Sequence, residues 1–329
     1  MVRKFIGIMI VIIILFMAVF SLYPDTTDQH KNNDSPKMIT KIREKDGMVM
    51  VYIPEGEFSM GSTIGESLVF LNFKLFAFPD QRPKHKVFLD GYWIDQTEVT
   101  VGMFKKFIEV TGHKTSAEKE GWGKPWRDGP KEDEWPMIPG TDWLHPQGPE
   151  SITHEDHPVV QVSWEDAIAY VKWIGGSLPT EAQWEKAARG TDGRRFPWGD
   201  EFDGNFLNYG DSLCPVGRWR DHKYNDGYAY TSPVGSYPDG ASPYGVLDMA
   251  GNVWEWVADW YYEDYYENST YQNPVGPFNG QVKAQRGGSW YDGEPEAWVN
   301  CVVRHQNPVN DRYEDVGFRC VMPAKKGEN

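Results

Sequence analysis

Cysteine is scarce in this 329-residue sequence, which contains only Cys214, Cys301 and Cys320. Three cysteines allow at most one intramolecular disulfide bond, so a fold held together mainly by disulfides is excluded. Nucleophilic cysteine chemistry needs an exposed thiolate beside a base. Cys301 instead lies in the stretch Val-Asn-Cys-Val-Val (residues 299–303), whose alternation predicts a strand with a buried, inert thiol. We expect the same burial for Cys320.

Several other chemical signatures are missing as well. The sequence has no Gly-x-Ser-x-Gly nucleophile elbow, no phosphate-binding loop and no paired-glycine dinucleotide fingerprint. The closest histidines, His145, His154 and His157, do not follow a zinc-binding spacing. The net charge of −15 argues against phosphate recognition, which needs clustered Lys and Arg. We therefore expect no nucleic-acid partner.

The N-terminal 23 residues carry a clear targeting signal. Arg3 and Lys4 precede an apolar run that extends over residues 5–23, and Asp25 and Asp28 follow it. As a helix this run would span roughly 28 Å, close to the hydrocarbon thickness of a bilayer. The basic N-terminal flank predicts that the rest of the chain lies outside the cytoplasm. We expect an uncleaved membrane anchor, preferred over a signal sequence, with the domain facing the periplasm or cell exterior.

The remainder reads as a polar tether (residues 24–46), one domain (residues 47–324) and a short tail (residues 325–329), because no later linker or repeat interrupts the chain. Its 33 Gly and 23 Pro predict many turns, and its 15 Trp, 17 Tyr and 16 Phe predict an aromatic core. Short strands are expected within residues 48–61 and 87–95. Helices are expected after the N-caps Thr100, Ser163 and Thr180. After residue 190 we expect short strands and ordered loops but no helix.

Calcium is the ion that the sequence favours. It takes six to eight oxygen ligands, often from carboxylates, amides and backbone carbonyls together. Two sets of residues could supply such ligands: Asn208, Tyr209, Asp226 and Tyr228 in the first, and Asp248, Gly251, Val253 and Glu255 in the second. Glu255 lies between two tryptophans, where a buried carboxylate needs a cation or several donors. An ordinary Asn-Asp-Gly turn and a Gly-rich turn before a core strand remain the alternatives.

Eight motifs, in order, resemble the formylglycine-generating enzyme (sulfatase-modifying factor) family across roughly residues 48–323. They are Gly-Glu-Phe-Ser-Met-Gly-Ser (56–62), Glu-Val-Thr-Val-Gly-Met-Phe (98–104), His-Pro-Val-Val-Gln-Val-Ser-Trp (157–164), Leu-Pro-Thr-Glu-Ala-Gln-Trp-Glu (178–185), Phe-Pro-Trp-Gly-Asp (196–200), Asp-Met-Ala-Gly-Asn-Val-Trp-Glu-Trp (248–256), Arg-Gly-Gly-Ser-Trp (286–290) and Gly-Phe-Arg (317–319). The resemblance implies a single α+β domain of the C-type-lectin-like type, with little regular secondary structure. It also implies calcium at the two sets of residues above.

In this family a substrate peptide binds in a groove beside the Gly-Gly-Ser segment, which here ends at Ser289. The resemblance therefore implies a peptide or protein ligand in a groove formed by Ser289, Trp290, Tyr291, Asp292, Trp254 and Arg304. In the active enzymes two cysteines just after this segment hold copper(I) and oxidise a sulfatase cysteine with O₂.

This chain departs from that pattern, because residues 290–298 read Trp-Tyr-Asp-Gly-Glu-Pro-Glu-Ala-Trp. The first catalytic position holds Asp292, and the second falls near Glu296 or Ala297. Copper(I) prefers thiolates to carboxylates, so we expect no copper and no copper-dependent oxidation. The positions that would form the family's disulfides with Cys301 and Cys320 hold Ala188 and Val171.

Three functions remain open. We favour an extracytoplasmic, calcium-binding pseudoenzyme that binds a peptide or protein partner or acts as an accessory maturation factor. The second is an enzyme with a different active site, in which Asp292, Glu294 and Glu296 do acid–base work. The third is a variable ligand-display protein that uses residues 291–315 as its binding face.

Overall fold

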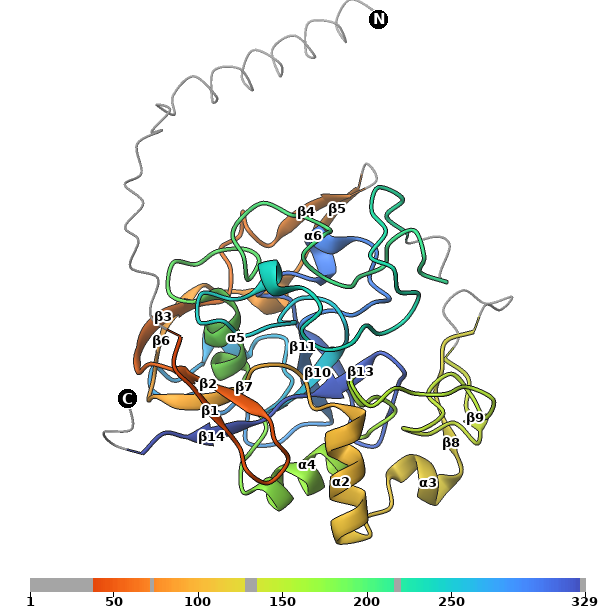
Figure 1. Cartoon of the computed structure of the whole chain (residues 1–329). Helices are drawn as coiled ribbons and strands as arrows, with labels where there is room; N and C mark the ends of the chain where they lie inside the picture. The colour runs from red at the N-terminus through yellow and green to blue at the C-terminus, as the bar shows by residue number, and fades with distance from the viewer. Residues whose placement is uncertain (1–37, 72–73, 128–134, 216–219, 326–329) are drawn as a thin grey trace, which may run out of the picture. The chain divides into compact units, whose positions relative to one another are not determined.

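The computed structural model describes residues 38–71, 74–127, 135–215 and 220–325 (Figure 1). The expected membrane anchor and most of the expected tether lie outside these residues. Within the described ranges, none of the helices combines the length and the apolar character needed to cross a membrane.

Two four-stranded sheets frame the domain. The first has the order β1-β2-β7-β14 and is antiparallel throughout: β1 is Thr40–Ile42, β2 is Val49–Ile53, β7 is Tyr92–Asp95 and β14 is Val321–Pro323. The second has the order β12-β11-β10-β13: β12 is His305–Pro308, β11 is Val282–Arg286, β10 is Trp254–Trp260 and β13 is Val316–Phe318. In this second sheet β10 runs parallel to β13 and antiparallel to β11. The parallel pair places Trp254 opposite Val316.

Three two-stranded pairs complete the described strands. They are β3 (Gly56–Met60) with β6 (His85–Leu89), β4 (Leu68–Leu71) with β5 (Lys74–Ala77), and β8 (Trp122–Gly123) with β9 (Ile138–Pro139). The strands expected within residues 48–61 and 87–95 are confirmed as β2, β3, β6 and β7. The two segments do not pair internally as hairpins, since β2 pairs with β7 and β3 with β6.

The three expected helices are confirmed as α2 (Val101–Thr111), α4 (Trp164–Ile174) and α5 (Glu181–Arg189). In each, the side chain of the predicted N-cap residue accepts a hydrogen bond from the backbone amide three residues later. This contact satisfies one of the amide groups that a helix start leaves without a partner.

Two short helices, α3 (Ser116–Glu120) and α6 (Pro295–Trp298), were not expected. The second corrects the prediction of no helix after residue 190. It is a single turn with Pro at its first position, too short to produce a helical periodicity in the sequence. The described part of the chain also contains three 3-10 turns: η1 (Pro79–Gln81), η2 (Pro238–Gly240) and η3 (Tyr265–Glu267).

The folded domain begins earlier than residue 47. Strand β1 falls inside the expected tether, and Arg43 beyond it is only 6% exposed. The Arg43 guanidinium pairs with Asp46 at 2.7 Å and with Asp95 at 2.6 Å. The boundary prediction therefore needs correction, because a three-residue strand and a partner about fifty residues away leave no local pattern.

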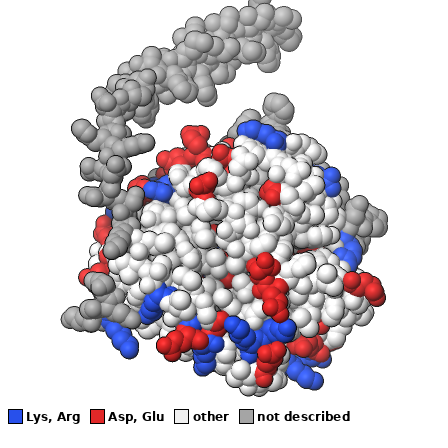
Figure 2. Space-filling model, in the orientation of Figure 1, with Lys and Arg blue, Asp and Glu red and all other residues white. Residues whose placement is uncertain are grey.

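Strand β10 contributes to both of the large apolar clusters of the core. Trp254 and Trp256 pack with residues of α2, α4 and β13, whereas Val257 packs with residues of β2, β3, β6, β7 and α5. Figure 1 shows β10, β11 and β13 side by side, with α5 next to them. On the face seen in Figure 2, basic and acidic side chains lie near one another.

None of the three cysteines forms a disulfide bond, and all three are buried, which confirms the expected burial of Cys301 and Cys320. Cys301 shares an apolar cluster with Ala188, and Cys320 shares another with Val171. The predicted strand over residues 299–303 is wrong. This segment forms turns after α6, and its apolar residues are buried without strand pairing.

Candidate functional site

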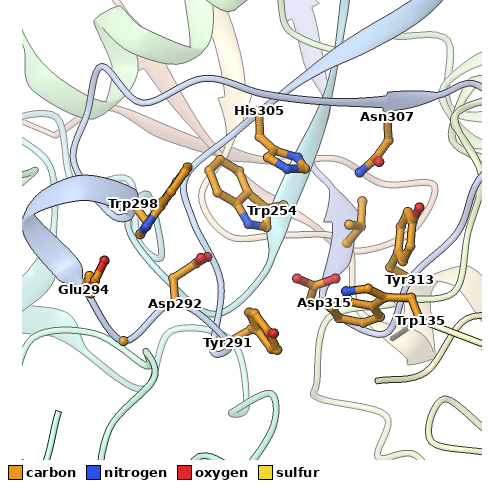
Figure 3. A pocket seen from close by; sticks show the side chains of 12 residues that line it. Trp135, Trp254, Tyr291, Asp292, Glu294, Trp298, His305, Asn307, Tyr313 and Asp315 are labelled. Carbon is orange, nitrogen blue, oxygen red and sulfur yellow. The ribbon is translucent and has the colours of Figure 1, made fainter. Parts of the chain in front are cut away.

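A cavity of about 390 Å³ opens beside the segment that follows β11 (Figure 3). Its described lining contains five aromatic side chains, three carboxyl groups and an imidazole, but no Lys, Arg or Cys. The lining residues are Trp135, Trp254, Tyr291, Asp292, Gly293, Glu294, Trp298, His305, Asn307, Tyr313, Asp315 and Val316. They come from β10, α6, β12 and β13 and from loops far apart in the sequence.

Two features of the backbone shape this cavity. Gly287 and Gly288 have φ angles of 106° and 77°, and a Cβ on Gly288 would lie 2.5 Å from the carbonyl oxygen of Trp298. Glycine is required for this turn, which places Ser289 next to the cavity. On the other side, the Trp254 amide donates to the Asp315 carbonyl at 2.8 Å, so the β10–β13 pairing brings Asp315 to the same place.

Ser289 connects two carboxyl groups. Its Oγ lies 3.1 Å from Oδ2 of Asp292 and 3.1 Å from Oδ2 of Asp315, and its backbone amide donates to Asp292 at 2.9 Å. A serine hydroxyl has one proton and can donate to only one of these oxygens. The second contact is satisfied when a carboxyl group itself carries a proton. Figure 3 shows both carboxyl groups below the Trp254 indole.

The environment of this pair favours such a shared proton. Burial, followed by the charge of Asp315, raises the pKa of Asp292 to about 7. Burial likewise raises the pKa of Asp315 to about 7. Two neighbouring carboxyl groups removed from water do not both ionise readily, so near neutral pH the pair retains proton occupancy.

Aromatic rings form the rest of the wall. The Trp135 ring centroid lies 5.4 Å from that of Tyr291 and 5.2 Å from that of Tyr313. The Trp254 ring lies 5.0 Å from the His305 imidazole. His305 Nδ1 is 3.0 Å from Oε1 of Gln285, and burial lowers the pKa of His305 to about 4. The imidazole is therefore neutral at physiological pH and adds no positive charge to the cavity.

The structure brings most of the predicted groove residues to this cavity. Trp254, Tyr291 and Asp292 line it, and Ser289 lies behind Asp292. Trp290 instead packs in a buried cluster with Cys214, and Arg304 is buried in an ion pair with Glu181 at 2.8 Å. Neither Trp290 nor Arg304 lines the cavity.

Of the three predicted catalytic candidates, two line the cavity and one does not. Asp292 and Glu294 line the cavity. Glu296 is exposed and lies 3.4 Å from the Arg195 guanidinium, outside the lining.

The sequence reasoning missed several lining residues: Trp135, Trp298, His305, Asn307, Tyr313, Asp315 and Val316. All but Trp135 and Val316 lie within residues 291–315, whose mixture of polar and aromatic residues was the signal that could have found them. To predict Asp315 as a lining residue, one would also have to know that β10 pairs in parallel with β13, about sixty residues away.

The first predicted calcium set contains two buried oxygen atoms without hydrogen-bond partners, Oδ1 of Asn208 and Oδ2 of Asp226. The Asn208 amide nitrogen donates to the Tyr230 carbonyl at 2.8 Å, which leaves its oxygen free for another contact. Burial raises the pKa of Asp226 to about 7. Unsatisfied buried oxygens of an amide and a carboxyl group are the donors that calcium takes, so this set fits the ion.

The second predicted set is arranged differently. Both carboxylate oxygens of Glu255 bind Arg319, and one of them also accepts from the Trp184 indole at 2.9 Å. Glu98, not predicted, is fully buried close to Asp248, and its Oε2 has no partner. Burial and the charge of Asp248 raise the pKa of Glu98 well above its usual value. Three carboxyl groups, those of Glu98, Asp248 and Glu255, lie near one guanidinium, that of Arg319. An additional cation would offset this excess of acidic groups.

Within the described ranges, no group of three or more His, Cys, Asp or Glu side chains is placed to hold a metal ion. Both predicted calcium sets would consequently depend on backbone carbonyls, here those of Tyr209, Tyr228, Gly251 and Val253. Such ligands are common for calcium and uncommon for zinc.

Comparison with known proteins agrees with the motifs. A family model described as "Sulfatase-modifying factor enzyme 1-like domain" matches residues 36–324. The chain is 36% identical to a formylglycine-generating enzyme of Streptomyces coelicolor over 311 residues, covering 83% of this chain and 89% of the relative. It is 33% identical to the "Inactive C-alpha-formylglycine-generating enzyme 2" of Mus musculus, covering 84% and 86%.

Among solved structures, PvdO from Pseudomonas aeruginosa superimposes with a TM-score of 0.64 at 25% identity, covering 87% of this chain and 98% of PvdO. The fold is therefore that of the formylglycine-generating enzymes, with sparse helix and strand, as expected. The chain belongs to the sulfatase-modifying factor (formylglycine-generating enzyme) family.

Proposed function

We propose that this protein is a membrane-anchored, extracytoplasmic member of the family that binds a peptide or protein partner in the cavity beside Ser289. Its role is that of a binding or accessory maturation factor, and it does not oxidise cysteine with copper. One observation carries the proposal: the cavity next to the Gly-Gly-Ser segment is walled by aromatic rings and carboxyl groups, and its described lining contains no thiol.

The state of the thiols supports the absence of copper chemistry. Asp292 stands where the family resemblance expects the first copper ligand, and a carboxylate is a poor ligand for copper(I). Cys214, Cys301 and Cys320 are buried in three separate apolar clusters. Burial raises the pKa of Cys301 to about 12, which suppresses the thiolate that would bind metal. The relatives include both active enzymes and an inactive paralogue, so membership is compatible with this loss.

We further propose calcium at both predicted sets. The first set has the stronger support, because the unpartnered oxygens of Asn208 and Asp226 lie within it. In the second set, the buried carboxyl groups of Asp248 and Glu98 would supply the negative charge that holds the ion. Bound calcium would hold together a region with few helices and long loops.

Peptide selection tests the binding function. A random peptide library displayed on phage is panned against the purified full-length protein, and selected peptides are titrated calorimetrically. We expect Tyr291→Ala and Trp135→Ala to weaken binding at least tenfold. The matched control is Tyr271→Ala, which removes an exposed tyrosine outside the cavity. Failure to select any peptide, or binding unaffected by the two cavity variants, would refute the proposal.

Acid–base catalysis is the second candidate, favoured by the Asp292–Ser289–Asp315 arrangement. Two carboxyl groups that share a proton near pH 7 can act as a general acid and a general base. Mass spectrometry of a selected peptide after incubation distinguishes the two functions. If the protein is an enzyme, the wild type modifies the peptide and the Asp292→Asn variant, tested at a peptide concentration that saturates it, does not. If the protein only binds, neither the wild type nor the variant modifies the peptide.

A further inference from the structure

We propose that the cavity recognises an organic cation, an ammonium or guanidinium group on a short aliphatic chain, with Asp292 and Asp315 as its counter-ions. This inference rests on the proposed function, since it names the chemistry of the ligand for the same cavity. The corresponding part of a peptide ligand would be a lysine or arginine side chain.

The charges around the cavity are unbalanced. Asp292, Glu294 and Asp315 line it, and its described lining contains no Lys or Arg. Lys124 lies behind the wall, 5.0 Å from the Tyr313 ring centroid, but its ammonium group pairs with Asp311 at 2.8 Å. That ammonium is therefore already paired, and the described lining offers no Lys or Arg as a counter-ion for Asp292 and Asp315.

Several other buried carboxylates of this domain are neutralised by arginine. Glu181 pairs with Arg304 at 2.8 Å, and Glu185 pairs with Arg286 at 2.8 Å. Glu255 is neutralised in the same way by Arg319. The Asp292–Asp315 pair differs because the side chains that bond it, Ser289 and the Trp254 indole, are both neutral. Since a buried charge is costly without a counter-ion, a cation brought by the ligand would stabilise this pair.

The aromatic wall suits the same group. Cations are attracted to the faces of Trp and Tyr rings, and the aliphatic part of an amine or guanidine packs against their apolar surface. Trp135 and Tyr313 are nearly perpendicular, with an interplanar angle of 84°, so the wall turns a corner around the cavity. A volume of about 390 Å³ admits a side-chain-sized group.

Proton release should accompany binding. A cation favours the ionised form of both aspartates and so lowers their pKa from the raised values in the free protein. Affinity should therefore rise as the pH increases through about 7. The other titratable or charged groups around the pair are Glu294, Glu314, His305, Tyr291, Tyr313, Lys124, Asp311 and Arg127. His305 is neutral over this range, because burial lowers its pKa to about 4.

The test uses purified full-length protein and three cations: n-butylammonium, N-butylguanidinium and choline. The neutral counterparts are 1-butanol for the first two and 3,3-dimethyl-1-butanol for choline. Binding is followed by tryptophan fluorescence and calorimetry at pH 6 and pH 8. We expect at least one cation to bind tenfold or more tightly than its neutral counterpart, and more tightly at pH 8. The comparison of the three also shows whether a lysine-like, arginine-like or quaternary group is preferred.

Variants locate the binding. Asp292→Asn and Asp315→Asn should each weaken the preferred cation at least tenfold, with circular dichroism confirming that both remain folded. The control Glu263→Gln removes an exposed carboxylate outside the cavity and should have no effect. Equal binding of cations and neutral counterparts, or no cation binding up to the solubility limit, overturns the inference.

The outcomes separate this inference from the proposed function. Peptides that bind through Tyr291 but lack Lys and Arg would support the proposed function and refute the inference that the cavity recognises a cation. Cation binding at Asp292 without any selectable peptide would support cation recognition and refute the proposed peptide-binding function. If neither class of ligand binds, both are refuted.

Discussion

Arg319 binds both carboxylate oxygens of Glu255, with its Nε 2.7 Å from Oε2 and its Nη2 2.7 Å from Oε1. Both side chains are fully buried, and the pair joins β10 to the residue directly after β13. It therefore fastens the two parallel strands that form one side of the cavity. It also means that both oxygens of Glu255 are already bound before any metal is considered.

Breaking this pair should destabilise the fold. We expect Glu255→Gln to lower the free energy of unfolding by about 3–5 kcal/mol, because it leaves the Arg319 guanidinium buried without its counter-ion. The measurement is urea unfolding, with calcium and with chelator. The control Glu57→Gln breaks an exposed pair with Lys86 and should change stability little. A loss of stability confined to the calcium buffer would show instead that Glu255 acts through the metal.

Removal of calcium should lower the melting temperature of the wild-type protein by several degrees. An ion bound only to the folded state, at a hundredfold excess over its Kd, contributes about 2.7 kcal/mol. We expect Asp226→Asn to melt at a lower temperature in calcium and to be less sensitive to chelator, because a ligand of the better-supported set is weakened. The exposed Asp239→Asn is the control, and it should behave as wild type. Identical melting of the wild type in both buffers would contradict the calcium proposal.

The acid pair should make stability depend on pH. The folded pKa of Asp292 is raised to about 7, so the folded state holds a proton that the unfolded state loses above about pH 4. The stability that protonated Asp292 contributes is fully present below pH 4 and is lost as the pH rises through 7. We therefore expect Asp292→Asn to gain about 2–3 kcal/mol relative to wild type between pH 5 and pH 8. Urea unfolding at the two pH values measures this, and an unchanged difference would contradict the raised pKa.

Topology is testable in cells. An alkaline phosphatase reporter fused after Asn329 should be active, because we place the C-terminus outside the cytoplasm. The full chain should sediment with membranes. Replacing Arg3 and Lys4 with glutamate should lower reporter activity, since basic residues before the apolar run set its orientation. Recovery of a soluble form that begins near residues 22–26 would show a cleaved signal sequence instead.

Local signals predicted the helices well. Thr100, Ser163 and Thr180 each accept a hydrogen bond from the amide three residues later. A helix start of this kind can therefore be predicted from three or four consecutive residues. The short strand β1 and the single-turn α6 had no such pattern. Both are stabilised by tertiary contacts, which a reading of local periodicity cannot detect.

The candidate site was predicted only in part, because some of its residues come together only through contacts between distant segments. Ser289 and Asp292 follow directly after the Gly-Gly turn, and the family resemblance placed them in a groove. Asp315 and Trp135 reach the cavity only through pairing between distant segments. Arg304 was expected in the groove from the family resemblance, but it neutralises Glu181 inside the core.

The central claim, that this cavity has exchanged copper–thiolate chemistry for ligand binding by carboxyl and aromatic groups, is tested most directly by the family reaction itself. The full-length protein is incubated with copper(I), reductant, O₂ and a sulfatase Cys-x-Pro-x-Arg peptide, and the peptide mass is followed. The formylglycine-generating enzyme of Streptomyces coelicolor serves as the positive control. We predict conversion of the cysteine to the aldehyde by the control only. The corresponding mass loss with this protein, above a copper-only blank, would contradict the account.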